Sequence, residues 1–235
     1  MKIDIITLFP AMFNGVFGES ILARAQKNKI IKIRILNLRD FAKDRYRTVD
    51  DEPFGGGCGM VLKPEPLHSA INYAKNGTKK SKVIYLSPQG RVFNQSIAKK
   101  LSKEKHIILL CGHYEGIDER VMKFVDEEIS IGDYILTGGE IAAMAVIDCI
   151  ARLIPKVVKE SNSIKEESFS NSLLDYPCYT RPREFKGMKV PEILLSGNHK
   201  KIRDWRLQQS LKNTKIKRPD LYKIYGFAAK LKVKN

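Results

Sequence analysis

Apolar and amphipathic segments alternate along the first 155 residues of the chain. Short apolar runs, which predict strands, cover residues 3–8, 30–38, 83–86 and 107–110. Amphipathic stretches, which predict helices, cover residues 20–28, 64–75, 94–103 and 117–124. Residues 140–154 are apolar on nearly every face and predict a buried helix, in the core or in a subunit interface, that stops before Pro155. This alternation predicts an α/β fold around a mostly parallel sheet.

Three residues are suited to helix starts. Ser20 and Asn94 suit N-caps, because their side chains can accept hydrogen bonds from the first backbone N–H groups of a helix. Pro64 suits a first turn, where its missing N–H has no intrahelical partner to lose. The pattern therefore predicts helices that begin near these positions.

The chain turns polar from residue 156 to about residue 174, which is typical of a linker. The sequence predicts an α/β domain over residues 1–160, a linker over 161–174 and a small helical domain over 175–235. Within that last domain, residues 200–211 predict a helix docked by one face, and 191–195 predict a helix or an extended turn. A lone tryptophan at helical spacing favours packing of Trp205 in a small core over stacking on a base.

The net charge is +16 over 235 residues. Residues 161–235 carry 17 Lys and Arg against 7 Asp and Glu, whereas residues 1–160 carry 25 against 19. A positive charge of this size attracts polyanions, so the C-terminal domain is the candidate nucleic-acid-binding surface. The alternative is a basic surface that is only solvated.

Several function classes find no support in the sequence. No run of about 18 apolar residues predicts a membrane span, and the N-terminus lacks the features of a signal peptide, so we expect a cytoplasmic protein. The four cysteines are widely spaced, which predicts neither a disulfide framework nor a zinc site. The sequence lacks the G-x-G-x-x-G fingerprint of dinucleotide-binding proteins and the G-x-x-x-x-G-K-[ST] phosphate loop of nucleotide-binding proteins.

Three glycine-bearing loops follow strand-like segments, at residues 87–91, 111–116 and 131–140. The third lies between an acidic strand end and the long apolar helix. Ligands of open α/β sheets bind beyond the carboxyl ends of strands, so the three loops together predict one pocket, although each alone is compatible with a plain turn. A ligand that carries adenosine but needs no phosphate loop suits this pattern.

A fourth loop, at residues 45–60, is long, charged and then rich in glycine. Long loops of this kind are usually functional or disordered. Arg45 and Arg47 are candidates for phosphate contacts, and a flexible surface lid is the alternative.

Five motifs give the chain a specific resemblance. They are Leu86-Ser-Pro-Gln-Gly-Arg91, Cys111-Gly-His-Tyr-Glu-Gly-Ile-Asp-Glu-Arg120, Ser130-Ile-Gly-Asp-Tyr-Ile-Leu-Thr-Gly-Gly-Glu140, Arg47-Thr-Val-Asp-Asp51 with Gly55-Gly-Gly57, and Leu195-Ser-Gly-Asn-His199. From residue 1 to about residue 221 the chain resembles the bacterial tRNA (guanine-37-N1)-methyltransferase family. The resemblance implies methyl transfer from S-adenosyl-L-methionine to N1 of the guanine 3′-adjacent to the anticodon of tRNA.

The resemblance also implies an architecture and partners. The family has a SPOUT-type α/β fold with a deep C-terminal trefoil knot, and it forms homodimers with active sites at the subunit interface. Ordinary topology rules treat true knots as essentially absent, so they predict none here. The family also suggests Mg²⁺, although no cluster of metal ligands is visible in the sequence.

The family pattern assigns the donor site to the three loops and the strand ends before them. The implied donor-binding residues are Tyr85, Leu86, Gly112, Gly116, Ile131, Gly132, Asp133, Tyr134, Ile135, Leu136, Gly138 and Gly139. The implied contacts to tRNA are Glu115, beside the target guanine, and Asp175, Arg181, Asn198, His199 and Arg206. Phosphate contacts of this kind weaken steeply with salt.

The reaction requires a general base, because guanine N1 carries a proton at neutral pH. The family uses an aspartate followed by Ser-Phe, and here Glu167 precedes Ser168 and Phe169, one methylene further from the backbone. Glu166 and Asp175 are the alternatives, and the residues alone favour a solvated acidic pair on a linker.

The resemblance implies that Arg152 stabilises the charge that develops on the guanine carbonyl. A cation interacting with the helix dipole is the alternative.

Two lesser departures from the family pattern are Cys58 and Cys178, and the tail beyond residue 221 is short. Two rival functions also stay open. A 2′-O-ribose methyltransferase of the same superfamily would share the donor site without a base-recognising pocket. A non-catalytic RNA-binding protein would not need Arg152 or an acidic residue at position 167.

Overall fold

The computed structural model of the chain describes residues 1–77, 80–158, 168–169 and 172–233, with residues 227–233 described through their backbone alone. The chain divides into two compact units, residues 1–159 and residues 160–235. Much of the segment expected to be a linker, including Glu166 and Glu167, lies outside the described residues.

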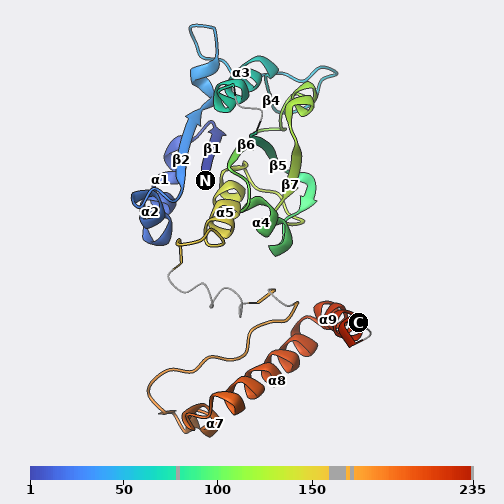
Figure 1. Cartoon of the computed structure of the whole chain (residues 1–235). Helices are drawn as coiled ribbons and strands as arrows, with labels where there is room; N and C mark the ends of the chain where they lie inside the picture. Colours follow the sequence, from blue (N-terminus) through green and yellow to red (C-terminus); the bar gives the residue numbers. More distant parts are fainter. Residues whose placement is uncertain (78–79, 159–167, 170–171, 234–235) are drawn as a thin grey trace. The chain divides into compact units, whose positions relative to one another are not determined.

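One parallel sheet organises the first unit (Figure 1). Its strands are β1 (Lys2–Thr7), β2 (Lys32–Asn37), β5 (Lys82–Val92), β6 (His106–Cys111) and β7 (Glu127–Ser130). They lie in the order β2-β1-β6-β5-β7, and every neighbouring pair is parallel. The α/β fold and the four strands expected from the apolar runs are confirmed.

Helices cover both faces of this sheet, because side chains alternate along each strand and both sets are apolar. On one face lie η1 (Pro10–Phe13), α1 (Asn14–Gly18), α2 (Ser20–Lys27), α4 (Gln95–Leu101) and α5 (Glu140–Ala151). On the other lie η2 (Leu38–Phe41), α3 (Pro64–Lys75) and η3 (Glu119–Phe124). Ile3 and Ile5 point to the first face, and Ile6 points to the second.

The helix starts agree with the sequence in two places and differ in two. Asn94 accepts a hydrogen bond from the Ile97 N–H at 3.1 Å, and Pro64 begins α3, as expected. Ser20 is wrong as a cap: it lies inside α2, whose N-cap is Glu19. The helix expected over residues 117–124 is a 3₁₀ helix that begins at Glu119, because Ile117 pairs with Leu62 in an isolated β-bridge.

The long loop at residues 45–60 includes part of a small antiparallel ladder. In this ladder β3 (Asp50–Asp51) pairs with β4 (Val61–Leu62). Two-residue strands show no periodicity, so the hydrophobic pattern does not predict them. The ladder makes residues 52–60 the tip of a hairpin.

A buried ion cluster lies near the amino ends of the strands. Asp4 is fully buried and accepts hydrogen bonds from Arg34 Nε at 2.8 Å and from Arg34 Nη2 at 2.9 Å. His106 Nε2 lies 2.9 Å and Lys2 Nζ lies 3.0 Å from the same carboxylate. Burial alone would raise the pKa of Asp4, but the hydrogen bonds from Arg34, Lys2 and His106 outweigh it, and the net pKa is lowered.

Asp4→Asn is expected to lower the free energy of unfolding by about 2 kcal/mol at neutral pH, because it leaves the partly buried cations Lys2 and Arg34 without their carboxylate. A lowered folded-state pKa contributes stability that is present above the ordinary Asp pKa and is lost as the pH falls through the folded value. Urea unfolding of wild type and variant should therefore differ at pH 7 and converge as the pH falls through the lowered pKa of Asp4. An equal difference at neutral and at acid pH would contradict this account.

The second unit consists mainly of helices: α7 (Glu192–Leu195), α8 (His199–Lys217) and α9 (Pro219–Val233). A small hairpin, β8 (Glu184–Phe185) with β9 (Met188–Lys189), precedes them. The helix expected at residues 200–211 is confirmed within the longer α8. Trp205 is half-buried, with its ring centroid 6.5 Å from that of Tyr179. Among the described residues no helix is long and apolar enough to cross a bilayer.

Candidate functional site

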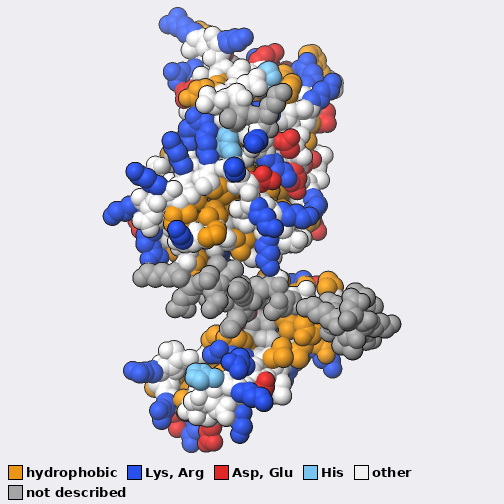
Figure 2. Space-filling view, in the orientation of Figure 1, with side chains coloured by type: hydrophobic (Ala, Val, Ile, Leu, Met, Phe, Trp, Pro, Cys, Tyr) orange, Lys and Arg blue, Asp and Glu red, His pale blue; other side chains and the backbone are white. Residues whose placement is uncertain are grey.

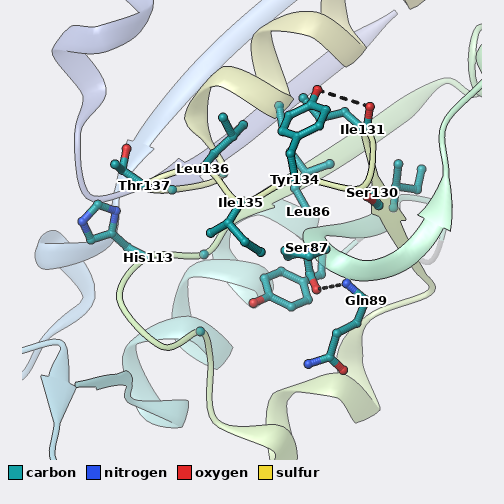
Figure 3. Close-up of a pocket in the computed structure, with 18 of the residues that line it drawn as sticks. Leu86, Ser87, Gln89, His113, Ser130, Ile131, Tyr134, Ile135, Leu136 and Thr137 are labelled. Carbon is teal, nitrogen blue, oxygen red and sulfur yellow. Dashed lines mark hydrogen bonds between the residues drawn. The ribbon is translucent and has the colours of Figure 1, made fainter. Parts of the chain in front are cut away.

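A cavity of about 440 Å³ opens where the segments after Leu86, Cys111 and Ser130 meet. The second and third segments follow β6 and β7 at their carboxyl ends, which is where open α/β sheets bind ligands. The first segment was expected to be a loop after a strand that ends at residue 86, but it lies within β5, where that strand leaves its pairing with β7 between Leu86 and Arg91. Figure 3 shows His113 and Thr137 on one side of the cavity and Ser87 and Gln89 on the other, with Ile135 between them. The structure thus brings the three glycine-bearing loops together around one space.

Backbone contacts join two of these loops closely. The Gly139 N–H donates to the Gly112 carbonyl oxygen at 2.9 Å, and His113 pairs with Gly138 in an isolated antiparallel bridge. A Cβ added to Gly139 would lie 2.8 Å from the Cys111 Cα. Since backbone cannot move aside as a side chain can, this approach requires glycine.

Nearly all of the expected donor-binding residues line this cavity. They are Tyr85, Leu86, Gly112, Gly116, Ile131, Gly132, Tyr134, Ile135, Leu136, Gly138 and Gly139. Asp133 is exposed and is not among the lining residues. The cavity is also lined by residues that were not predicted individually, among them Ser87, Gln89, His113, Tyr114 and Thr137. All of them belong to the same three sequence motifs, which could have indicated them.

Burial keeps two side chains neutral: Tyr85, which lines the cavity, and Cys111, at the end of β6. Burial, and then the charge of Glu128, raise the pKa of Tyr85 to about 12, so its hydroxyl stays protonated. Burial, and then Glu140, hold the pKa of the Cys111 thiol well above its ordinary value. A thiol in this state is a poor nucleophile, so the geometry offers no thiolate chemistry at Cys111.

One polar atom of the cavity wall is buried and unpaired. His113 Nδ1 is inaccessible to solvent and has no hydrogen-bond partner among the described residues. The ring is held between Phe9, at 4.9 Å between centroids, and Tyr114, at 4.7 Å. An unpaired buried nitrogen, together with glycines that leave room for backbone contact, fits a polar ligand seated between the loops.

Glu115 lines the same cavity from the loop after β6. Its backbone N–H donates to the Met60 carbonyl oxygen at 3.0 Å, and Leu62 N–H donates to the Gly116 oxygen at 3.0 Å. These bonds fix the β3–β4 hairpin against the loop. Within the described part of the chain, no donor hydrogen-bonds the Glu115 carboxylate, which is exposed and available to a ligand.

The other described residues expected to act are at the end of α5 and in the second unit. Arg152 is the C-cap of α5, whereas the cavity adjoins the N-terminal end of that helix. In the second unit, Arg181 and His199 are exposed, and Asn198 caps α8 by accepting from the Lys201 N–H at 3.1 Å. The Arg206 guanidinium lies 4.7 Å from the Tyr176 ring centroid. The Asp175 carbonyl oxygen accepts from Asn213 Nδ2 at 3.0 Å.

Comparison with known proteins gives a consistent result. Residues 1–224 match the family model described as tRNA (Guanine-1)-methyltransferase TrmD. A tRNA (guanine-N(1)-)-methyltransferase of Endomicrobium trichonymphae is 57% identical, covering 95% of this chain and 100% of the relative. Proteins of the same description from Ruminiclostridium cellulolyticum and Carboxydothermus hydrogenoformans are 57% and 58% identical, covering 94% and 99% of this chain and 96% and 92% of each relative.

Proposed function

The chain belongs to the tRNA (guanine-N1)-methyltransferase family, and from that premise we propose that it methylates N1 of guanine 37, the base 3′-adjacent to the anticodon. The observation that supports the position of the chemistry is the glycine-lined cavity with the free carboxylate of Glu115 at its wall. S-adenosyl-L-methionine, the methyl donor implied by the family, supplies an electrophilic methyl group.

The donor binds in the cavity between the three loops. Backbone groups of Gly112, Gly138 and Gly139 face the adenosine, and the aliphatic side chains of Leu86, Ile131 and Leu136 enclose it. Such a site needs no phosphate cradle, which agrees with the missing phosphate-loop motif. The Tyr85 hydroxyl, which keeps its proton, serves as a hydrogen-bond donor.

Glu115 binds the target guanine. The Watson–Crick edge of guanine offers an exocyclic N2–H donor beside N1, and the Glu115 carboxylate can accept from it while N1–H stays available to the base. Adenine has no amino group at that position and cannot make this hydrogen bond. The unpaired carboxylate of Glu115 supports this role.

The N1 proton passes to the Glu167 carboxylate, which is the counterpart of the family's aspartate; Glu166 and Asp175 are the alternative bases. Arg152 stabilises the charge on the guanine carbonyl. A helix rises 1.5 Å per residue, so Arg152 lies about 20 Å along α5 from Gly139 at the cavity. That separation supports active sites in which Arg152 and Glu167 of one subunit serve the cavity of the other.

A homodimer also explains an exposed apolar face beside the cavity. Phe9, Met12 and Val16 are each about two-fifths exposed, and Ile141 of α5, which packs against η1, is 48% exposed. Figure 2 shows hydrophobic side chains gathered over α5. A second copy that covers this face would bury the apolar surface by a symmetric, self-complementary contact.

The basic second unit binds tRNA, with Arg181, Asn198, His199 and Arg206 as contacts. Its excess of Lys and Arg suits phosphate binding. The family's trefoil knot, which we propose for residues of the cavity loops, is consistent with their close backbone packing. The described residues contain no cluster of three His, Cys, Asp or Glu side chains that could hold a metal ion.

Methyl transfer from labelled donor to tRNA transcripts tests the proposal. We expect incorporation with guanine at position 37 and none above background with adenine there, because adenine lacks the exocyclic N2–H group that Glu115 would bind. Incorporation that ignores this base would instead favour a ribose methyltransferase. Tight RNA binding without any incorporation would favour a non-catalytic RNA-binding protein.

A further inference from the structure

Gly59, near the end of the β3–β4 hairpin loop, lies directly against the side chain of Glu115. A Cβ added to Gly59 would lie 2.6 Å from Glu115 Oε1, 2.7 Å from its Cγ and 3.1 Å from its Cδ. All three distances are shorter than, or at the limit of, real carbon contacts. The Glu115 side chain thus occupies the space that any side chain at position 59 would need.

Backbone hydrogen bonds fix this contact in place. Glu115 N–H bonds to the Met60 oxygen, and Asp118 N–H bonds to the Leu62 oxygen, each at 3.0 Å. The hairpin therefore cannot slide away from the loop without breaking the pairing between them. No donor among the described residues holds the Glu115 carboxylate, so the close contact with Gly59 is a restraint on where this exposed side chain can lie.

We propose that Gly59 is a positioning residue for guanine specificity: its bare backbone lets the Glu115 carboxylate lie where it meets the Watson–Crick edge of the target base. This inference rests on the proposed function of Glu115. It extends the site to the β3–β4 hairpin, which lies far from the donor loops in the sequence. A displacement of the carboxylate by even 1 Å is enough to weaken such recognition.

Gly59→Ala tests this, with Gly55→Ala as the matched control. Gly59 has φ of +88° and Gly55 has φ of +92°, so both substitutions strain the backbone alike, but nothing lies within 4 Å of a Cβ at Gly55. We expect Gly59→Ala to lower kcat/KM for the guanine-37 transcript about tenfold or more and to lower the guanine-over-adenine preference. For Gly55→Ala, kcat/KM should stay within about twofold of the wild-type value. Donor affinity measured by calorimetry should be unchanged in both variants.

A double-mutant cycle with Glu115→Ala isolates the contact. Alanine removes Cγ, Cδ and Oε1, the three atoms that a Cβ at position 59 would meet, so Gly59→Ala should cost less than about twofold in that background. Equal losses in Gly59→Ala and Gly55→Ala, or full additivity with Glu115→Ala, would overturn the inference. If Gly59→Ala does not fold, Glu115→Ala should restore folding, and failure to do so would also overturn it. An inactive wild type would contradict the proposed function instead.

Discussion

Gly90→Ala is expected to destabilise the first unit by about 3 kcal/mol or more, which corresponds to a fall in melting temperature of about 6–12 °C. A Cβ at Gly90 would overlap the backbone nitrogen of Ile129 and would lie 2.6 Å from the carbonyl carbons of Glu128 and Ile129. These atoms belong to β7, so relief requires movement of a strand rather than of a side chain. Thermal unfolding followed by circular dichroism measures the effect.

The reason lies in how β5 and β7 pair. Leu86 and Arg91 of β5 both pair with Ile129, and the residues between them leave the ladder and return. Gly90 is at the point of return. Gly15→Ala is the control, because a Cβ there meets nothing within 4 Å, and its stability should change by less than about 1 kcal/mol. Equal melting temperatures for the Gly90 and Gly15 variants would refute the steric argument.

Glu167→Gln is expected to slow methyl transfer by about 10²- to 10⁴-fold, since it removes the proposed general base while keeping nearly the same shape. Single-turnover rates at saturating donor measure the chemical step, and donor affinity should be unchanged. Glu166→Gln is the adjacent control, and its rate of methyl transfer should stay within about threefold of the wild-type rate. A larger loss in the Glu166 variant, or none in either, would place the base elsewhere, with Asp175 as the next candidate.

Mixed dimers test which subunit supplies the base. A Glu167→Gln subunit mixed with an equal amount of a Gly139→Val subunit should regain about a quarter of wild-type activity, because half of the dimers are mixed and each has one intact site. Each variant alone should be inactive. No recovery in the mixture would show that Glu167 serves the cavity of its own subunit.

The sequence predicts the sheet well because its strands are continuous apolar runs, such as residues 107–110 of β6. It also predicts the convergence of the three loops, since parallel strands end at one edge. It does not predict the β3–β4 ladder, because two residues carry no period, nor the contact of Gly59 with Glu115, which joins segments more than fifty residues apart. Ser20 fails as a cap because α2 begins at Ser20 itself, so that the extended residue before it, Glu19, takes the N-cap position.

The order of strands has a consequence for synthesis of the chain. β1 lies between β2 and β6, and its partner on one side, β6, begins about a hundred residues later. At translation rates of roughly 5–20 residues per second, one edge of β1 stays unpaired for on the order of 5–20 s until β6 has been synthesised. During this interval the nascent chain presents an apolar strand edge, which is a template for wrong pairing. Chaperones that bind apolar segments are therefore expected to associate with the ribosome-bound chain before residue 111 emerges.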